Sequence, residues 1–411
     1  MTYDEAVTWM VNSVPMFQNV GQGAYKPGLA TTEALDAHFG HPHRRFRTIH
    51  VGGTNGKGSC SHTLAAILQA AGYRVGLFTS PHLVDFRERI RVNGQPIDEE
   101  SVVAFIEGGR SFFEPLHPSF FELTTALAFH YFAQQQVDVA VIEVGLGGRL
   151  DCTNIITPDL CVITNISLDH MALLGDTVAQ IAVEKAGIIK GGIPVVIGES
   201  DPATRPVFER RAATVGAPIC FASDGRHTPA DMPDYELKGY CQERNIVTIL
   251  TAVDELRRLG YHLGDDAVHD GCAHVCESTG LMGRWQTVST APLTVCDTGH
   301  NIGGWQYLVR QIADTPCRRR RLVMGFVNDK DLQPIFSILP RDAVYYFATP
   351  SVKRGLPAQS LRAVAHAHGI DGTAYDSVGA AYATALADSE PDDFIYVGGS
   401  TFVVADFLRT R

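Results

Sequence analysis

The chain lacks the features that mark several broad classes of protein. Its 34 Lys and Arg are outnumbered by 45 Asp and Glu, and the net charge of −11 argues against a general nucleic-acid binder, which needs a basic face. No run of about 18 apolar residues is present, so we expect no transmembrane helix and no membrane partner. The segment Met1–Glu5 is acidic and lacks the basic start of a signal peptide. We therefore expect a cytoplasmic protein.

The cysteines indicate buried thiols rather than a disulfide framework. There are nine, an odd number, and several lie in apolar runs such as Leu160–Ile163. One short cluster holds His269, Cys272, His274 and Cys276. Because zinc sites usually combine two well-separated ligand pairs, we interpret this cluster as a loop with incidental His and Cys, and a zinc site is the alternative.

The chain is long enough for two or three domains, since it has 411 residues of which 45% are hydrophobic. After a helix at Tyr3–Val14 and a Gly- and Pro-rich loop at Gly21–Leu29, apolar strands alternate with helices, which is typical of an α/β domain with a mostly parallel sheet. A second α/β pattern begins near Ala291. We predict a P-loop-containing, mostly parallel sheet domain at 1–290 and a smaller Rossmann-like α/β domain at 291–411. The expected strands of the first domain are Phe46–Gly52, Arg74–Thr79, Val137–Val144, Leu160–Asn165 and Pro194–Ile197.

The segment Gly53–Ser59 is the strongest functional motif of the chain. It lies between an expected strand and an expected helix, where glycines let backbone N–H groups converge on phosphate oxygens and a lysine reaches the outer phosphates. It departs from the common G-x-x-x-x-G-K-[ST] form, because Val51 stands at the first glycine position and Gly58 separates Lys57 from Ser59. A mere tight turn is the alternative, but the strand–turn–helix context favours a nucleotide triphosphate.

Polar residues gather where the other strands of the first domain end. They are Ser80-Pro81-His82, the segment Glu143–Asp151, Asp169-His170 and Glu184-Lys185. A carboxylate at a strand end beside a phosphate loop suits Mg²⁺, which takes oxygen ligands and nucleotide phosphates. Taken alone, His170 is more typical of a capping residue and Lys185 of an exposed helix residue.

The second domain has its own polar segments at strand ends. They are Gly283-Arg284-Trp285, residues 297–301 and Gly398-Gly399-Ser400. Each is weak evidence alone, since Gly-rich strand ends are often only turns. Together they favour a cleft between two α/β domains, where ligands often bind.

These motifs, taken as a set, resemble the folylpolyglutamate synthase and dihydrofolate synthase family, within the superfamily of Mur-type amide ligases. The residues that carry the resemblance are G-T-N-G-K-G-S at 53–59, T-S-P-H-L at 79–83, E-R-I at 88–90, N-G at 93–94, E-V-G-L-G-G-R-L-D-C-T-N at 143–154, I-T-N-I-S-L-D-H at 163–170, L-G at 174–175, E-K-A-G-I-I-K at 184–190, G-R at 283–284 and D-T-G-H-N at 297–301. They span the chain in the expected order. The resemblance implies an ATP-dependent ligase that activates a carboxylate as an acyl phosphate, which the amino group of L-glutamate then attacks.

The resemblance also implies roles for individual residues. The nucleotide would contact Gly53, Thr54, Asn55, Gly56, Lys57, Gly58 and Ser59, together with Arg284, Asp297 and Asn301. Two Mg²⁺ ions would be held by Ser80, Glu143, His170 and a Lys185 carbamylated by CO₂, and a monovalent cation is also expected. Lys57, His170 and Lys185 would form the catalytic group. Dihydropteroate, reduced folates and L-glutamate would contact Gly28, Leu29, Pro81, His82, Asp151, Cys152, His300 and Ser400.

The chain departs from the family pattern at a few positions. Family members usually read D-G-A-H-N-P where this chain has Thr298 and Ile302, Cys152 replaces a usual alanine, and Cys241 stands where histidine is usual. We expect a monomeric ligase that adds L-glutamate to dihydropteroate and to reduced folates, in folate biosynthesis and one-carbon metabolism. The alternatives are a Mur-type ligase acting on a cell-wall precursor and a catalytically inactive nucleotide-binding regulatory homologue.

Overall fold

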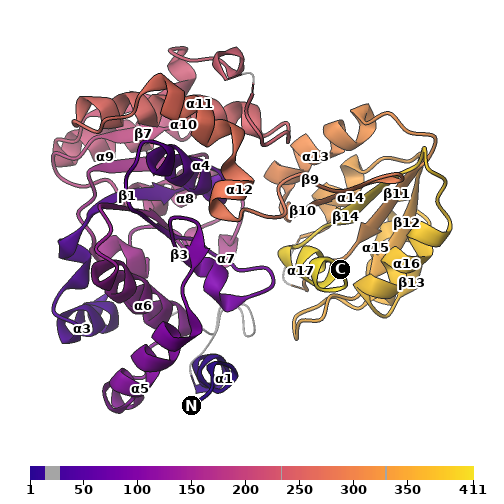
Figure 1. The fold of residues 1–411 in the computed structure, drawn as a ribbon. Helices are drawn as coiled ribbons and strands as arrows, with labels where there is room; N and C mark the ends of the chain where they lie inside the picture. The colour runs from indigo at the N-terminus through magenta and orange to yellow at the C-terminus, as the bar shows by residue number, and fades with distance from the viewer. Residues whose placement is uncertain (14–27, 233, 329–330) are drawn as a thin grey trace. The chain divides into compact units, whose positions relative to one another are not determined.

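The computed structural model describes residues 1–13, 28–232, 234–328 and 331–411, arranged in two compact units (Figure 1). The first unit comprises Met1–Glu236 and Gln242–Leu281, and the second comprises Leu237–Cys241 and Met282–Arg411. Residues 14–27, which include most of the expected Gly- and Pro-rich loop, lie outside the described part. Among the described helices, none is both long and apolar enough to cross a membrane.

The first unit is built on an eight-stranded sheet with the order β4-β3-β2-β5-β1-β6-β7-β8. Its strands are β1 (Arg47–Gly52), β2 (Val75–Phe78), β3 (Ile90–Val92), β4 (Gln95–Pro96), β5 (Val139–Glu143), β6 (Leu160–Ile163), β7 (Val195–Ile197) and β8 (Ile219–Phe221). Only the edge strands β3 and β4 run antiparallel to their neighbours. The predicted mostly parallel sheet is therefore confirmed, and the expected strands are found with ends shifted by a residue or two.

Helices cover both faces of this sheet, which explains the continuous apolar runs of its strands (Figure 1). One face carries α4 (Lys57–Ala70) and α10 (Gln242–Arg258), and the other carries α6 (Phe120–Gln134). The remaining helices of the unit are α1 (Tyr3–Ser13), α3 (Ala30–His38), α5 (Glu99–Leu116), α7 (Met171–Leu174), α8 (Val178–Ala186), α9 (Arg205–Val215), α11 (Asp265–Ala273) and α12 (Val275–Thr279).

The segment around His269 and Cys276 is not a loop, and that expectation is wrong. It forms α11 and α12, and α11 packs closely on α4. A Cβ atom added to Gly271 would lie 2.5 Å from the Cα atom of Ile67. The glycine that weakens the local helix signal is therefore what lets the two helices approach.

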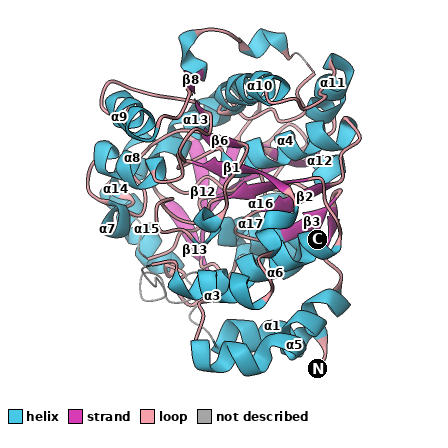
Figure 2. Ribbon diagram, turned by 90° about the vertical axis from the view of Figure 1, so that its left-hand side faces the viewer, coloured by secondary structure: helices cyan, strands magenta, loops and turns pink. Residues whose placement is uncertain are grey.

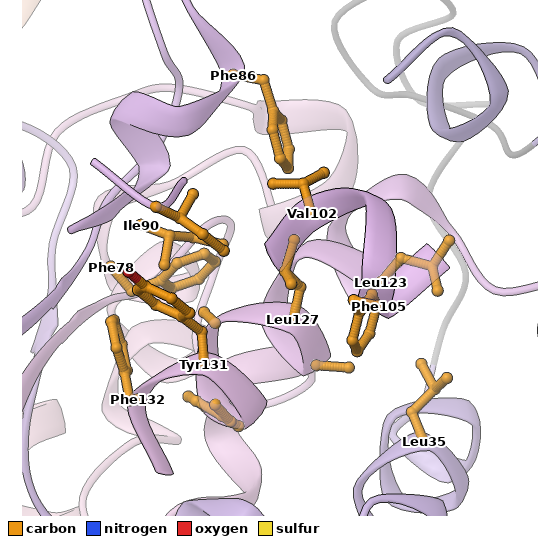
Figure 3. Close-up of a cluster of buried hydrophobic side chains, with 14 of the residues drawn as sticks. Leu35, Phe78, Phe86, Ile90, Val102, Phe105, Leu123, Leu127, Tyr131 and Phe132 are labelled. Carbon is orange, nitrogen blue, oxygen red and sulfur yellow. The ribbon is translucent and has the colours of Figure 1, made fainter. Parts of the chain in front are cut away.

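A cluster of aromatic and aliphatic side chains fills the space between α5, α6 and the sheet (Figure 3). Phe78 of β2 and Phe132 of α6 are fully buried there. Helix α6 begins with a capping box, in which the Ser119 side chain accepts from the Glu122 N–H and the Glu122 carboxylate accepts from the Ser119 N–H. The cap fixes the start of α6, and burial of its apolar side chains packs the helix along its length against β2 and β5.

The second unit has a six-stranded sheet with the order β13-β12-β11-β14-β10-β9, in which only β9 is antiparallel. Its strands are β9 (Gln286–Thr290), β10 (Leu293–Asp297), β11 (Arg320–Met324), β12 (Ala343–Ala348), β13 (Gly372–Tyr375) and β14 (Phe394–Gly398). Its helices are α13 (Ile302–Asp314), α14 (Gln333–Ile338), α15 (Ala358–Ala367), α16 (Val378–Ala387) and α17 (Thr401–Arg409) (Figure 2). The main segment of this unit begins at Met282, before the expected position 291, because β9 pairs with β10.

The segment Leu237–Cys241 belongs to the second unit although the chain on both sides of it belongs to the first. Its anchor is Gln311 of α13, whose Nε2 donates to the Lys238 carbonyl at 2.9 Å and whose Oε1 accepts from the Tyr240 N–H at 2.8 Å. The Tyr240 hydroxyl also donates to Asp314 at 3.0 Å. A buried glutamine thereby joins two segments that are far apart in the sequence.

A buried carboxylate joins the starting ends of β14 and β11 and generates a stability prediction. Asp393 has no exposed side-chain surface, and its oxygens lie 3.0 Å from both Arg318 and the buried Arg321. Asp393→Ala would leave the Arg321 guanidinium with one partner fewer in a buried site. We expect the free energy of unfolding of the second unit to fall by about 3–5 kcal/mol in urea titrations. Asp392→Ala, at the exposed neighbouring position, should change it by less than about 0.5 kcal/mol; equal effects of the two changes would contradict the account.

Candidate active site

The predicted site residues of the first unit meet at one edge of its sheet. Strands β2, β5, β1 and β6 are consecutive neighbours and run parallel, so the segments after their carboxyl ends lie side by side. Glu143 is the register partner of Val51, which lies two residues before the phosphate loop. This edge therefore brings together Ser80, Glu143, the loop at 53–59 and the segment that ends at His170.

The conformation of the phosphate loop requires glycine at two positions. Gly53 has φ +136°, and a Cβ atom there would lie 2.0 Å from Oγ1 of Thr164. Gly56 has φ +81°, and its Cβ atom would lie 2.3 Å from Oδ1 of Asn245. Helix α4 begins directly afterwards at Lys57, so the N–H groups of its first turn and the positive end of its dipole face the loop.

Residues after β6 anchor the loop and were not assigned a role from the sequence. Thr54 donates its N–H to the carbonyl of Asn165 at 2.9 Å, and Asn55 donates its N–H to the Asn165 side chain, also at 2.9 Å. Thr164 Oγ1 donates to the Asn55 carbonyl at 2.5 Å. From the other side, Gln242 of α10 donates to the Ser59 hydroxyl at 3.1 Å. In the sequence, Thr164 and Asn165 were indicated only by the motif I-T-N at 163–165.

Two lysines converge on one backbone carbonyl of the loop. Lys57 Nζ donates to the carbonyls of Gly53 and Thr54 at 3.1 Å each, and Lys185 Nζ donates to the Gly53 carbonyl at 2.7 Å. Lys185 is only 5% exposed, so its default interpretation as a surface residue is wrong. Burial lowers the pKa of Lys185 to about 7, and the charge of Lys57 acts in the same direction.

Ser80 and Glu143, which are predicted to share a metal ion, lie in contact. The Ser80 N–H donates to Glu143 Oε2 at 3.1 Å, and Glu143 is 3% exposed. The buried Arg89 donates from Nε to His82 Nδ1 at 2.7 Å. Burial lowers the pKa of Arg89 to about 10, and the negative charge of Glu143 opposes this shift. Arg89 was not predicted as a site residue, yet its hydrogen bond restricts the orientation of the His82 ring.

His170 lies at the start of α7 with φ +50°. Its N–H donates to Asp169 Oδ1 at 2.9 Å, and its Nε2 lies 3.9 Å from Asp169 Oδ2. In the described part of the chain, no three His, Cys, Asp or Glu side chains are grouped as a metal cage. The oxygen donors of Ser80 and Glu143 fit Mg²⁺, which usually completes its shell with phosphate and water.

Cys152 of the predicted pterin site begins the segment Cys152–Ile155 (η4), which packs against α3, the helix that follows Gly28-Leu29. Asp151 caps η4, and its carboxylate accepts from the N–H groups of Leu146 at 2.8 Å and Thr153 at 3.0 Å. Burial raises the pKa of Asp151 and of the Cys152 thiol. Asp151 thus orders the Gly-rich loop before it, and a direct substrate contact by its carboxylate stays a prediction.

Of the predicted residues of the second unit, Asp297, His300, Asn301 and Ser400 lie at or after the ends of two paired strands, since Asp297 of β10 is the register partner of Gly398 of β14, whereas Arg284 lies before β9. The Asp297 carboxylate accepts from the N–H groups of Trp285 at 2.7 Å and Gly299 at 2.8 Å. Burial raises the pKa of Asp297, while the charge of Arg284 opposes the shift.

Three further predicted residues of the second unit are engaged locally. Asn301 caps α13 by accepting from the Gly304 N–H at 3.0 Å, and Ser400 caps α17 by accepting from the Val403 N–H at 3.3 Å. His300 Nδ1 lies 3.1 Å from the Thr298 carbonyl. Asn301 and Ser400 therefore have structural roles that the motif comparison did not indicate.

Comparisons with known proteins agree with these two units. The Mur ligase middle domain matches residues 51–214, and the Mur ligase glutamate ligase domain matches residues 283–401. The fold and its strand-end loops thus define a Mur-type ligase. Folylpolyglutamate synthase of Lacticaseibacillus casei is 34% identical over 442 residues, which cover 100% of this chain and 99% of the relative.

Two solved structures are similar over the whole chain. Escherichia coli FolC in complex with DHPP and ADP has a TM-score of 0.86 and 31% identity, covering 100% of this chain and 97% of that one. A bifunctional folylpolyglutamate synthase/dihydrofolate synthase with Mn, AMPPNP and L-glutamate bound has a TM-score of 0.85 and 30% identity, covering 100% and 98%. The chain belongs to the folylpolyglutamate synthase/dihydrofolate synthase family, as the resemblance predicted.

The conformation of Gly53 generates a prediction about the loop. Gly53→Ala combines an unfavourable φ with a clash against Thr164, which itself holds the Asn55 carbonyl. We expect ATP affinity, measured by calorimetry, to fall at least about tenfold, and the free energy of unfolding to fall by more than about 2 kcal/mol.

The matched control is Gly72→Ala. Gly72 also has positive φ, +88°, but a Cβ atom there would meet no heavy atom within 4 Å. Only the backbone cost, about 1 kcal/mol, should then appear, and ATP affinity should be unchanged. Similar losses in the two variants would show that contact with Thr164 does not constrain the loop.

Proposed function

We propose that this protein is an ATP-dependent amide ligase that adds L-glutamate to dihydropteroate and to reduced folates through an acyl phosphate. The observation that carries the proposal is the convergence of Lys57 and Lys185 on the Gly53 carbonyl, beside a helix N-terminus. Lys57 and the first-turn N–H groups make this edge a site for a highly charged phosphate chain, and the Lys185 amine lies beside it. Its relatives, a folylpolyglutamate synthase and a bifunctional enzyme with AMPPNP and L-glutamate bound, support the same reaction.

In this proposal the residues of the first unit hold the nucleotide and the pterin or folate substrate, whose carboxylate becomes the acyl phosphate. Lys57 and the start of α4 bind the outer phosphates, and His82, held by Arg89, borders the pterin site with Gly28, Leu29, Pro81 and Cys152. Ser80, Glu143 and His170 would hold the divalent cations, which neutralise charge on the transferred phosphoryl group. Arg284, Asp297 and Asn301 of the second unit serve the nucleotide, and His300 and Ser400 serve L-glutamate.

Lys185 is proposed to act as a carbamate. Its neutral amine attacks CO₂, forms the N–C bond and releases one proton, so a cation becomes a carboxylate-like metal ligand. A pKa of about 7 supports this step, because a large fraction of the amine is neutral at physiological pH, whereas a lysine near 10.5 is almost fully protonated. A monovalent cation and a monomeric, cytoplasmic enzyme complete the proposal.

The reaction is tested by ADP release with purified protein, Mg²⁺ and L-glutamate. We expect ADP release that requires glutamate and proceeds with dihydropteroate and with tetrahydrofolate as the substrates to which glutamate is added, called glutamate acceptors below. Activity with only one acceptor would reduce the proposal to a single activity. Activity with a muramyl peptide precursor alone would indicate a cell-wall ligase, and inactivity with all three acceptors would indicate an inactive homologue.

Removing the Lys185 amine tests the carbamate. Lys185→Ala should lower glutamate-dependent ADP release at least about a hundredfold, since it removes the carbamate that would hold a metal ion beside the transferred phosphoryl group. With isotope-labelled bicarbonate, the native protein should give a carbamate NMR signal that the variant lacks. Lys190→Ala is the matched control, because Lys190 also donates to a backbone carbonyl, that of Asn154 at 2.8 Å. Unchanged activity of Lys185→Ala would rule the carbamate out.

A further inference from the structure

Thr298, one of the departures from the family pattern, makes three hydrogen bonds to the Gly283-Arg284 segment. Its hydroxyl accepts from Arg284 Nη1 and donates to the Gly283 carbonyl at 3.2 Å. Its N–H donates to the same carbonyl at 3.1 Å. Thr298 is 8% exposed, so these bonds form in a largely water-free place where they are stronger than at the surface.

The Thr298 hydroxyl restricts the Arg284 side chain, which has many rotamers when it is free. An arginine side chain loses about 2 kcal/mol of rotamer entropy when it is fixed in one orientation. Arg284 Nη1 has two acceptors, the Thr298 hydroxyl and the Gly283 carbonyl at 3.2 Å. Because a guanidinium has five N–H donors, Nε and Nη2 keep donors for a ligand. The protein therefore bears the ordering cost of Arg284 before a substrate binds.

The backbone around Arg284 is held by contacts that do not involve the Thr298 hydroxyl. Trp285 has φ +46°, and its N–H donates to Asp297 Oδ2 at 2.7 Å. The indole ring packs on Phe394 and Tyr396, with ring centroids 6.1 and 6.2 Å apart. The Gly283 N–H donates to Gln286 at 2.8 Å. Loss of the hydroxyl should thus leave this backbone in place and release only the guanidinium.

We propose that Thr298 is a positioning residue that holds the Arg284 guanidinium in the orientation that binds the phosphates of the nucleotide. The proposal rests on the proposed nucleotide contact of Arg284. A glycine at position 298, usual in the family pattern, has no hydroxyl to supply this bond. The Thr298 hydroxyl therefore orients Arg284 in this chain, and its loss should weaken the binding of ATP and leave the binding of glutamate unchanged.

The test compares Thr298→Val, which replaces the hydroxyl by a methyl group of similar size, with Thr298→Ser, which keeps it. We expect Thr298→Val to raise the KM for ATP about tenfold, as for loss of a hydrogen bond to a charged group, and to leave the KM for glutamate within twofold. Thr298→Ser should restore the KM for ATP. The matched control is Thr294→Val, because Thr294 is also buried and its hydroxyl donates to the Pro292 carbonyl at 3.2 Å.

Each outcome decides the proposal. An unchanged KM for ATP in Thr298→Val, an equal rise in Thr294→Val, or failure of Thr298→Ser to restore it would overturn the positioning role. Arg284→Ala distinguishes this inference from the proposed function. An unchanged KM for ATP in Arg284→Ala would refute both the nucleotide contact of Arg284 and the positioning role of Thr298. The ligase reaction would not be refuted, because it is tested by ADP release with the native protein. In the double variant Thr298→Val/Arg284→Ala, we expect no rise beyond that of Arg284→Ala, and additive effects would contradict the coupling.

Discussion

The Gly53 carbonyl is the acceptor on which the rest of the site depends. It receives the amines of Lys57 and Lys185, which approach from the start of α4 and from α8. Two cations that share one acceptor repel each other in a buried place, and this repulsion adds to burial in lowering the pKa of Lys185. Only glycine fits at position 53, because φ there is +136° and a Cβ atom would lie 2.0 Å from Oγ1 of Thr164. Lys57 and the start of α4 thereby prepare this edge for phosphate before any ligand arrives.

Most of the fold could be predicted from the sequence, because buried parallel strands are short apolar runs with helices between them. Strands β1 and β5 are of this kind, and both were expected within two residues of their observed ends. The helices α11 and α12 could not be predicted in this way. Their stability comes from packing on α4 through Gly271, and a contact between positions 67 and 271 leaves no local pattern. Strand β9 was missed for the same reason, since it is stabilised by pairing with β10.

The residues of the site also differ in whether a local sequence pattern indicates them. The glycines of the phosphate loop have a local signature, and Gly53 and Gly56 need the positive φ that the motif indicates. The place of Lys185 could not be read from spacing, because its partner lies 132 residues away and only the family resemblance indicated it. Asn165 was missed because its partner Asn55 lies 110 residues away in the sequence. Arg89 was missed although its partner His82 is near in the sequence, because the contact forms across an irregular turn that has no periodic pattern.

The short segment Leu237–Cys241 has a consequence for how the protein can be divided. The second unit is not one continuous piece of chain, so a fragment that begins at Met282 lacks the strip that Gln311 binds. The side-chain amide of Gln311, which is 7% exposed, would then lose both of its partners. A chimaera that replaces this unit with that of a relative therefore has to include both segments of the chain. Residues 237–241 and α13 have to come from the same protein, so that the hydrogen bonds of Gln311 are kept.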